Sequence, residues 1–205
     1  MEITWLGRTC FRLKGRDGAV MMDPCPPESG YRYLAQPAEI VTFSRRADPR
    51  FSWREGVSGD PLVLDAPGEY EVGGILVTGI ASKLPDGGRN IVFVVEIDGI
   101  RIGHLGVPAP GHPGIDEVKD VDVLLIPVGG GPSLTAAAAA DAMTTVDPKI
   151  AVPMFYKTDL ETLELDPLER FIKETGSKAE PQLKLTVTRS SMPQALSVML
   201  LQPRA

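Results

Sequence analysis

The sequence predicts an α/β protein in which two β-sheets pack face to face and helices lie outside them. Short strand-like segments crowd the first half of the chain, and several are joined by two-residue turns such as Gly73-Gly74 and Asp98-Gly99. After residue 113, apolar strands alternate with helical segments. The chain has 205 residues, of which 43% are hydrophobic and 23% charged, so we expect one domain over 1–205.

The strands expected in the first half are short runs of β-branched and apolar residues. They cover 2–6, 9–14, 18–23, 38–43, 61–65, 68–72, 74–80, 91–97 and 100–105. The clearest hairpin is "NIVFVVEIDGIRIGHLG", in which Asp98-Gly99 sets the register.

The second half is expected to contain a strand over 121–127, an alanine-rich helix to about 146, a strand over 149–153, a helix from 166 to 176, and strands over 183–188 and 197–201. Ser133 or Thr135 is expected to cap the first helix. The run Asp166–Glu169 supplies a cap residue, a proline at the first helical position and a capping-box glutamate for the second. Gly176 suits a left-handed C-terminal cap.

Composition and charge exclude several classes of function. A formal net charge of −6 argues against binding nucleic acid through bulk charge. Cys10 and Cys25 are too few for a disulfide framework, which favours a reduced cytoplasmic setting. The N-terminus lacks the pattern of a signal peptide, and no apolar run approaches the roughly 20 residues of a membrane span. We therefore expect no membrane association.

One stretch, "AEIVTFSRRADPRFSW", combines a buried strand with a dense polar loop. The apolar run ends at Phe43, and Arg45, Arg46, Asp48 and Arg50 follow within seven residues. Active sites of α/β proteins often lie in loops that follow core strands. This loop is therefore the first candidate for a functional site.

Several phrases of the chain resemble, in order, small metal-dependent hydrolases of the metallo-β-lactamase superfamily. They are "ITWLGRTCFRL", "MMDPC", "IVTFS", "DAPGEYEVGGI", "GIRIGHLG", "VDVLLIPVGGG" and "PKIAVPMFYKT". The branch that looks most similar includes ascorbate-phosphate lactonase-like proteins, and the resemblance runs from residue 2 to about 158. It implies a four-layer αββα sandwich with the active site at one edge, between the sheets.

In that family a His-x-His-x-Asp-His run follows the "TFS" strand and binds one or two metals, usually zinc. The resemblance puts Arg45, Ala47, Pro49 and Arg50 at those four positions. The remaining metal positions that we can align carry Arg8, Leu84, Val107 and Phe155. None of these side chains is a zinc ligand. We therefore predict that the zinc or manganese site is lost and that the chain has no cofactor.

The three arginines at former metal positions form a candidate anion pocket. We expect at least two of Arg8, Arg45 and Arg50 to converge there, because the family's ligands face one cavity. The resemblance places Asp23 beneath that cavity, where an arginine could pair with it in a forked geometry. A small anion would bind to the remaining donors. The alternative is a charged loop that is simply solvated.

Other groups that could support chemistry are given structural interpretations. His104 ends a strand and is expected to be structural, whereas His112 lies in a proline-rich loop that could reach a pocket. The candidate nucleophiles are Ser44, Cys10, Cys25 and Ser133, but no Gly-x-Ser-x-Gly motif surrounds them. The "PVGGGPS" segment lacks the lysine of a P-loop and is interpreted as a structural turn.

Three hypotheses about function follow. The first is a non-catalytic protein that binds a small anion, a protein partner or a second copy of itself. The second is a hydrolase of small esters, lactones or phosphoesters that uses a displaced metal or no metal. The third is a pseudoenzyme subunit that pairs with an active paralogue. The lost ligands favour the first, and none involves nucleic acid or a membrane.

Overall fold

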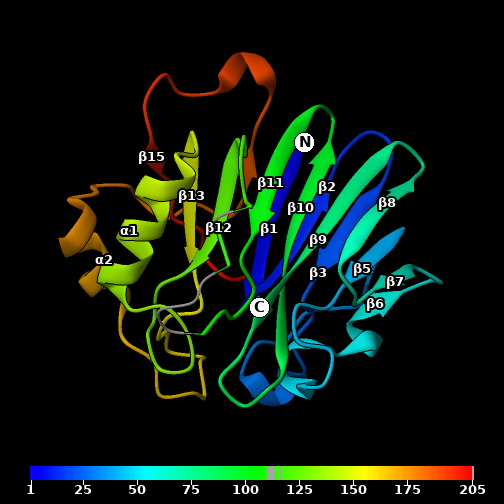
Figure 1. Ribbon diagram of the computed structural model, residues 1–205, viewed down its shortest axis with the longest axis horizontal. Helices are drawn as coiled ribbons and strands as arrows, with labels where there is room; N and C mark the ends of the chain where they lie inside the picture. Colours follow the sequence, from blue (N-terminus) through cyan, green and yellow to red (C-terminus); the bar gives the residue numbers. More distant parts are fainter. Residues whose placement is uncertain (110–113, 116, 205) are drawn as a thin grey trace.

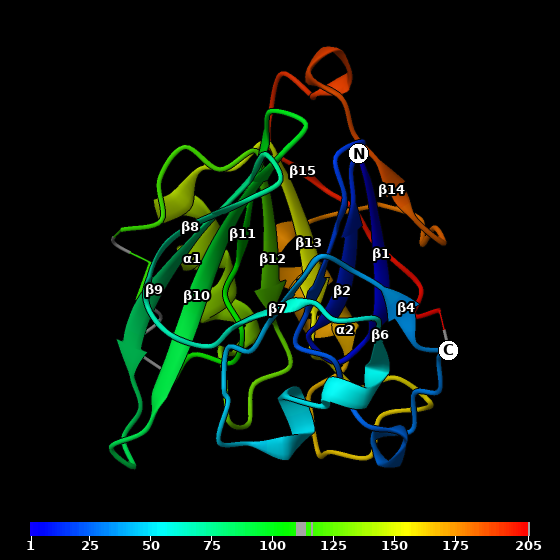
Figure 2. The same ribbon diagram turned by 90° about the vertical axis from the view of Figure 1, so that its right-hand side faces the viewer.

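The computed structural model describes residues 1–109, 114–115 and 117–204, and shows two sheets packed against each other (Figures 1 and 2). Two α-helices lie outside the second sheet, α1 (Ala136–Val146) and α2 (Leu168–Thr175). In the described part of the chain, no helix has the length and apolar character needed to cross a bilayer.

The first sheet has the strand order β14-β1-β2-β3-β5-β7. The strands β14, β1, β2 and β3 alternate in direction, and β5 and β7 run parallel to β3. Their bounds are β1 Glu2–Gly7, β2 Cys10–Lys14, β3 Ala19–Met22, β5 Ile40–Thr42, β7 Leu62–Leu64 and β14 Leu185–Thr186.

The second sheet has the order β15-β13-β12-β11-β10-β9-β8, with antiparallel strands from β8 to β11 and parallel strands after that. Its bounds are β8 Gly68–Val72, β9 Ile75–Lys83, β10 Arg89–Ile97, β11 Ile100–His104, β12 Val123–Pro127, β13 Ile150–Met154 and β15 Ser197–Val198. A separate ribbon pairs β4 (Gln36–Pro37) with β6 (Val57–Ser58). Four short 3₁₀ helices complete the described elements: η1 Pro27–Ser29, η2 Pro49–Phe51, η3 Arg54–Gly56 and η4 Arg189–Ser191.

The main core fills the space between the two sheets. Trp5 and Phe11 from the first sheet and Phe93 from the second are fully buried there. Successive residues of a strand point to opposite faces, so the alternating apolar residues of β1 and β2 supply one wall of this core. The parallel strands β12 and β13 are apolar throughout because α1 and α2 cover their outer face.

A second, smaller core lies on the outer face of the first sheet. Met21, Val41 and Phe43 point outward from β3 and the β5 region, and they pack against Tyr31 and Val57. The segment from 24 to 39 and the β4–β6 ribbon therefore cover this sheet, in the place that α1 and α2 take on the other side (Figure 2).

The predicted turns form as expected. Asp98 and Gly99 both have positive φ, 54° and 70°, as the tight hairpin between β10 and β11 requires. At α1, Thr135 is the N-cap and its hydroxyl accepts from the Ala138 amide. Gly176 ends α2 in the left-handed conformation.

The predicted capping box of α2 is wrong. The N-cap is Pro167, which has no side-chain capping bond, and the helix begins at Leu168. Asp166 lies one residue too early and pairs with Arg170 at 2.8 Å. This ion pair takes the carboxylate that the sequence pattern assigned to the helix N-terminus.

Several connecting loops leave the sandwich at the same end, the lower edge in Figure 1. They follow β5, β12 and β13, and the β9–β10 hairpin turn reaches the same edge (Figure 2). This arrangement brings together segments that are more than 100 residues apart in the chain. It is the end at which the sequence analysis places a functional site.

Replacing Thr135 with alanine is expected to lower the free energy of unfolding by about 1 kcal/mol, because the Ala138 amide loses its acceptor. Thr144→Ala is the matched control, since its hydroxyl only donates to the Ala140 carbonyl on an exposed part of the same helix. The control is expected to change stability by less than about 0.5 kcal/mol. Urea unfolding measures both, and equal losses would contradict the capping role.

Candidate functional site

The candidate site is a cavity of about 380 Å³ at the edge of the sandwich. We call it the edge pocket. One side is the loop after β5, which includes η2, and the other is the turn between β9 and β10. The residues that line it are Arg45, Ala47, Asp48, Pro49, Arg50, Leu84, Asp86, Gly88 and Arg89. It therefore lies at the edge that the resemblance predicts, and it contains three guanidinium groups.

Arg50 is tied to a neighbouring carboxylate in the same loop. Its Nε and Nη2 donate to the two oxygens of Asp48 at 2.8 and 2.6 Å, a forked geometry. Asp48 also accepts from the Arg50 amide and so caps η2. Partial burial raises the pKa of the Asp48 carboxyl, but the hydrogen bonds from Arg50 outweigh this effect and hold the pKa below its ordinary value. This pair is close to neutral overall.

Arg45 reaches back toward the interior of the sandwich. Its Nη2 donates to the Val107 carbonyl at 2.5 Å, and its Nε is buried with no hydrogen-bond partner among the described residues. Burial lowers the pKa of the guanidinium, while Asp48 opposes the shift. The Val107 carbonyl carries no formal charge, so this hydrogen bond does not neutralise the positive charge of Arg45.

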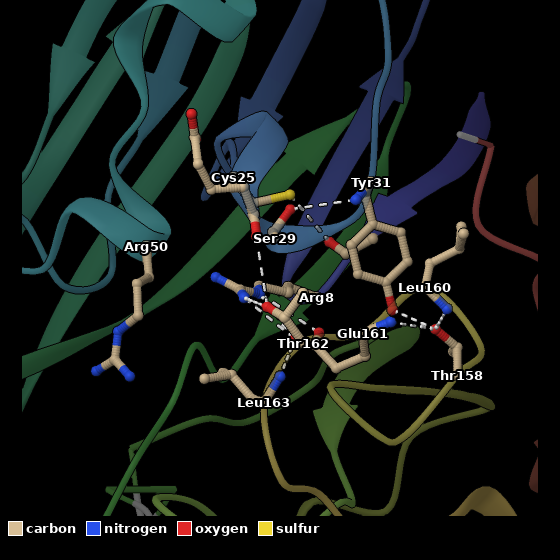
Figure 3. Close-up of polar contacts among 12 residues, drawn as sticks. Arg8, Cys25, Ser29, Tyr31, Arg50, Thr158, Leu160, Glu161, Thr162 and Leu163 are labelled. Atoms are coloured by element: carbon tan, nitrogen blue, oxygen red, sulfur yellow. Dashed lines mark hydrogen bonds and ion pairs between the residues drawn. The ribbon is translucent and has the colours of Figure 1, made fainter.

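Arg8 lies apart from the edge pocket, as Figure 3 shows for Arg8 and Arg50. It stands in the turn between β1 and β2 with a φ of 48° and is 3% exposed. Its Nε and Nη2 donate to Glu161 at 3.2 and 3.1 Å, and Nη2 also reaches the Thr162 hydroxyl. Glu161 in turn accepts from the Leu163 amide. This buried ion pair fixes the loop after β13 onto the first sheet.

The predicted pairing of an arginine with Asp23 is wrong. The acceptor for the Arg8 side chain is Glu161, and that for Arg50 is Asp48. Asp23 is fully buried, and its Oδ1 accepts from the Ser44 amide at 2.6 Å. Its Oδ2 has no hydrogen-bond partner among the described residues. Burial raises the pKa of this carboxyl, against the influence of His104 and the Ser44 amide.

Val107 and Phe155, which the resemblance aligns with metal ligands, are both fully buried. Val107 donates its amide to Asn90 and accepts from Arg45. The ring of Phe155 packs edge-on against Phe51 at 5.6 Å between centroids. Apolar packing therefore closes the interior behind the edge pocket.

Among the described residues, the other candidate catalytic groups have structural roles. The Nε2 of His104 contacts the Thr9 carbonyl at 2.8 Å, and its Nδ1 accepts from the Gly106 amide, so both nitrogens are engaged. The hydroxyls of Ser44 and Ser133 are buried without a hydrogen-bond partner in this part of the chain. Neither therefore has a histidine base among the described residues. His112 lies outside the described residues.

Cys10 and Cys25 are both free and buried. The thiol of Cys10 lies 3.5 Å from the Tyr33 hydroxyl, and burial raises its pKa well above the ordinary value. A buried thiol that holds its proton is a poor nucleophile. Cys10 therefore has a packing role, whereas the hydrogen bond with Cys10 lowers the pKa of the buried Cys25 thiol.

Sequence reasoning missed three residues that shape this end of the molecule. Glu161 follows the "PMFYKT" phrase by a few residues, and nothing in its local pattern predicts burial. Asp86 and Arg89 come from the β9–β10 turn and line the edge pocket. The turn residues Asp86-Gly87-Gly88 predict a reversal of the chain, but not its position next to the loop after β5.

Comparison with known proteins identifies a family. The profile of the family described as "Beta-lactamase superfamily domain" matches residues 2–155. A crystal structure of a candidate Zn-dependent hydrolase of the metallo-β-lactamase superfamily from Thermotoga maritima has a TM-score of 0.81 and 31% identity, covering 98% of this chain and 99% of that one. The predicted superfamily and its α/β sandwich are therefore confirmed.

Curated relatives extend over most of the chain as well. A UPF0173 metal-dependent hydrolase of Archaeoglobus fulgidus is 27% identical, covering 87% of this chain and 92% of that protein. A UPF0173 protein of Pyrococcus furiosus is 29% identical, covering 85% and 90%. The range matched by the family profile, residues 2–155, includes the loops that surround the edge pocket.

The names of these relatives contradict the prediction that the metal cofactor is lost. Relatives named metal-dependent hydrolases match more than four-fifths of the chain, and the prediction of no zinc or manganese is corrected accordingly. Within residues 1–109, 114–115 and 117–204, no group of three or more His, Cys, Asp or Glu side chains could hold a metal ion. The described residues thus do not fit a metal of this family, and we derive no chemical step from one. His112 and Asp116 lie outside this part of the chain.

Breaking the buried ion pair by Arg8→Gln or Glu161→Gln is expected to lower the free energy of unfolding by about 3–5 kcal/mol, because the other charge stays buried without a counter-ion. The two changes are expected to be strongly non-additive in urea unfolding. Arg8→Gln and Asp23→Asn are expected to add. Arg46→Gln, which breaks the exposed pair with Asp65, is the control and should cost less than about 1 kcal/mol.

The raised pKa of Asp23 predicts a pH-dependent contribution to stability. The folded protein holds this proton to a higher pH than the unfolded chain, whose carboxyl titrates near the ordinary value of 3.8. The stabilisation is therefore complete below 3.8 and declines as the pH rises through the interval up to the folded pKa. Asp23→Asn keeps the oxygen that accepts from Ser44 but does not titrate.

The stability of the wild type minus that of Asp23→Asn should thus be greatest at acid pH and decrease toward neutral pH. Urea unfolding of both proteins at a series of pH values measures the difference. A difference that is constant, or that grows with pH, would show that the folded pKa is not raised.

Proposed function

Because the chain belongs to the Beta-lactamase superfamily domain family, we propose that it is a hydrolase of small anionic esters or phosphoesters, which it binds in the edge pocket. The observation that carries the proposal is the arginine lining of this pocket, at the sandwich edge where the resemblance places the superfamily's active site. The names of relatives as metal-dependent hydrolases support hydrolysis as the type of reaction.

The charge of the edge pocket favours a substrate with one negative charge. Three arginines and two aspartates line it, so one positive charge remains. The Asp48 carboxylate is fully engaged by Arg50, which leaves Arg45 and Arg89 to attract the anion. A phosphodiester or a carboxylate-bearing ester or lactone has this charge. A volume of about 380 Å³ suits such a small molecule.

Arg45 is the group best placed to orient the substrate. Its hydrogen bond to the Val107 carbonyl fixes the side chain, so little conformational entropy is lost on binding. Arg45 lines the edge pocket, so its guanidinium places a positive charge beside an anion bound there. The residues described here orient the anion and exclude bulk water behind it.

Binding without turnover is the second candidate function, and one observation favours it. Val107 and Phe155, at two positions that the resemblance aligns with metal ligands, are buried apolar residues, and neither supplies an acid, a base or a nucleophile. In that case the protein would recognise the anion and leave its ester bond intact.

We expect the purified protein to hydrolyse bis(p-nitrophenyl) phosphate, with Zn²⁺, Mn²⁺ or Fe²⁺ added singly, faster than the uncatalysed reaction. Arg45→Gln and Arg89→Gln are expected to raise KM by about tenfold each, since each removes a charged hydrogen bond of about 1.5–3 kcal/mol. Arg16→Gln is the matched control, because this exposed arginine pairs with Asp98 away from the pocket. Its KM should stay within about twofold of the wild type.

The neutral ester p-nitrophenyl acetate separates the proposal from non-specific activity. Its acceleration over the uncatalysed rate should be smaller than that of the phosphodiester, and Arg45→Gln should not change it. Saturable binding of the phosphodiester with no turnover under any metal condition would support the second candidate. If the protein neither binds nor hydrolyses the phosphodiester, both candidate functions are contradicted.

A further inference from the structure

A second cavity, separate from the edge pocket, lies on the outer face of the first sheet. We call it the outer-face pocket, and its volume is about 360 Å³. Thr4 and Leu6 of β1 line it together with Arg12 of β2, and the crossing segment 32–36 and Arg204 complete it. In Figure 2 the strands β1 and β4 lie on this face, and the Arg204 amide donates to the Trp5 carbonyl of β1 at 2.8 Å. It shares no lining residue with the edge pocket.

The outer-face pocket carries a concentration of positive charge. Arg12, Arg32 and Arg204 line it, and none of them forms an ion pair with a carboxylate in the described part of the chain. Glu2 is the acidic residue in the lining, and it accepts from Lys184 at 2.7 Å. Its charge is therefore already compensated. In a chain with a net charge of −6, three arginines that form no ion pair among the described residues are a marked local excess.

Arg12 provides a fixed donor at this cavity. Its Nη2 donates to the Pro37 carbonyl at 3.1 Å, which holds the guanidinium against the crossing segment. Its Nε is buried and lacks an acceptor among the described residues. Arg12 lines the cavity and forms no ion pair among the described residues, so an anionic oxygen there would gain a charge-assisted hydrogen bond from its guanidinium.

The other side of the outer-face pocket is apolar. Leu34 is 84% exposed at its rim, and the ring of Tyr33 lies beside it. The Tyr33 hydroxyl donates to the Cys25 carbonyl at 3.3 Å, which fixes the ring in place. Leu6 adds a buried apolar surface at the floor. A ligand that fits has an anionic end and an apolar body.

We propose that the outer-face pocket binds a small soluble phosphomonoester. A phosphate dianion matches three guanidinium groups in charge and in its forked hydrogen-bond geometry, better than a single carboxylate would. The phosphate faces Arg12, Arg32 and Arg204, and the organic group lies on Tyr33 and Leu34. This site is additional to the hydrolase pocket and does not depend on turnover there.

Phenylphosphonate is the probe, because it carries a dianionic head and an aromatic body and has no ester bond to hydrolyse. Isothermal titration calorimetry of the full chain is expected to show saturable binding that weakens as salt is raised. Arg32→Gln combined with Arg204→Gln should weaken it by at least about tenfold. Inorganic phosphate should bind more weakly than the probe, since it lacks the apolar body.

Two further variants separate this site from others. Arg16→Gln combined with Arg170→Gln removes the same charge from exposed positions elsewhere, and binding should stay within about twofold. Arg45→Gln combined with Arg89→Gln disables the edge pocket and should leave this binding event intact. Failure of the hydrolase proposal would therefore not affect the outcome.

The proposal is overturned by three results. The first is the absence of saturable binding to the wild type. The second is a loss in the Arg16/Arg170 control equal to that in the Arg32/Arg204 variant, which would indicate long-range charge alone. The third is loss of the event in the edge-pocket variant with retention in the Arg32/Arg204 variant. As a second readout, the Arg12 Nε–H resonance should shift on titration with phenylphosphonate, and an unchanged resonance would contradict contact with Arg12.

Discussion

The apolar interface between the two sheets is the constraint on which the rest of the structure depends. Trp5, Phe11 and Phe93 can be buried together only if both sheets turn their apolar faces inward and stay in register. Once they do, the loops after the parallel strands emerge at one end, as Figure 1 shows. The edge pocket is thus a consequence of sheet packing. Its lining comes from two loops, one connected to each sheet, that are far apart in the sequence.

Three buried ionisable groups find their hydrogen-bond or ion-pair partners in different ways. Arg8 and Glu161 form a pair whose extra hydrogen bonds offset the loss of water. His104 is engaged on both nitrogens by the backbone. Asp23 forms no ion pair among the described residues; it accepts from the Ser44 amide, and burial raises its pKa. The two arginine-lined cavities differ from these sites. Among the described residues, no carboxylate forms an ion pair with Arg45 and Arg89 of the edge pocket or with Arg12, Arg32 and Arg204 of the outer-face pocket. Charge is therefore available where water and ligands can reach it.

The sequence predicted local features well and distant pairings poorly. Asp98-Gly99 and Thr135 act through neighbours a few residues away, so their patterns are sufficient to predict the hairpin and the helix cap. The partner of Arg8 lies 153 residues along the chain, and no local pattern distinguishes Glu161 from a solvated glutamate. Family resemblance located Arg45 and Arg50 at the edge pocket, but it also placed Arg8 there, missed Arg89 and gave Asp23 the wrong partner. Local features were predicted and long-range pairings were not, because a pairing depends on tertiary contacts that cannot be read from a single sequence.

The position of β14 at the edge of the first sheet has a consequence for synthesis on the ribosome. The strands β1 and β2 are complete by residue 14, yet the partner that covers the free edge of β1 is made at residues 185 and 186. At about 5–20 residues per second, that edge stays open for roughly 10–30 s while the chain grows. An open strand edge is a template for pairing with other chains. The nascent protein therefore passes through an interval in which chaperone protection of its first strand matters most.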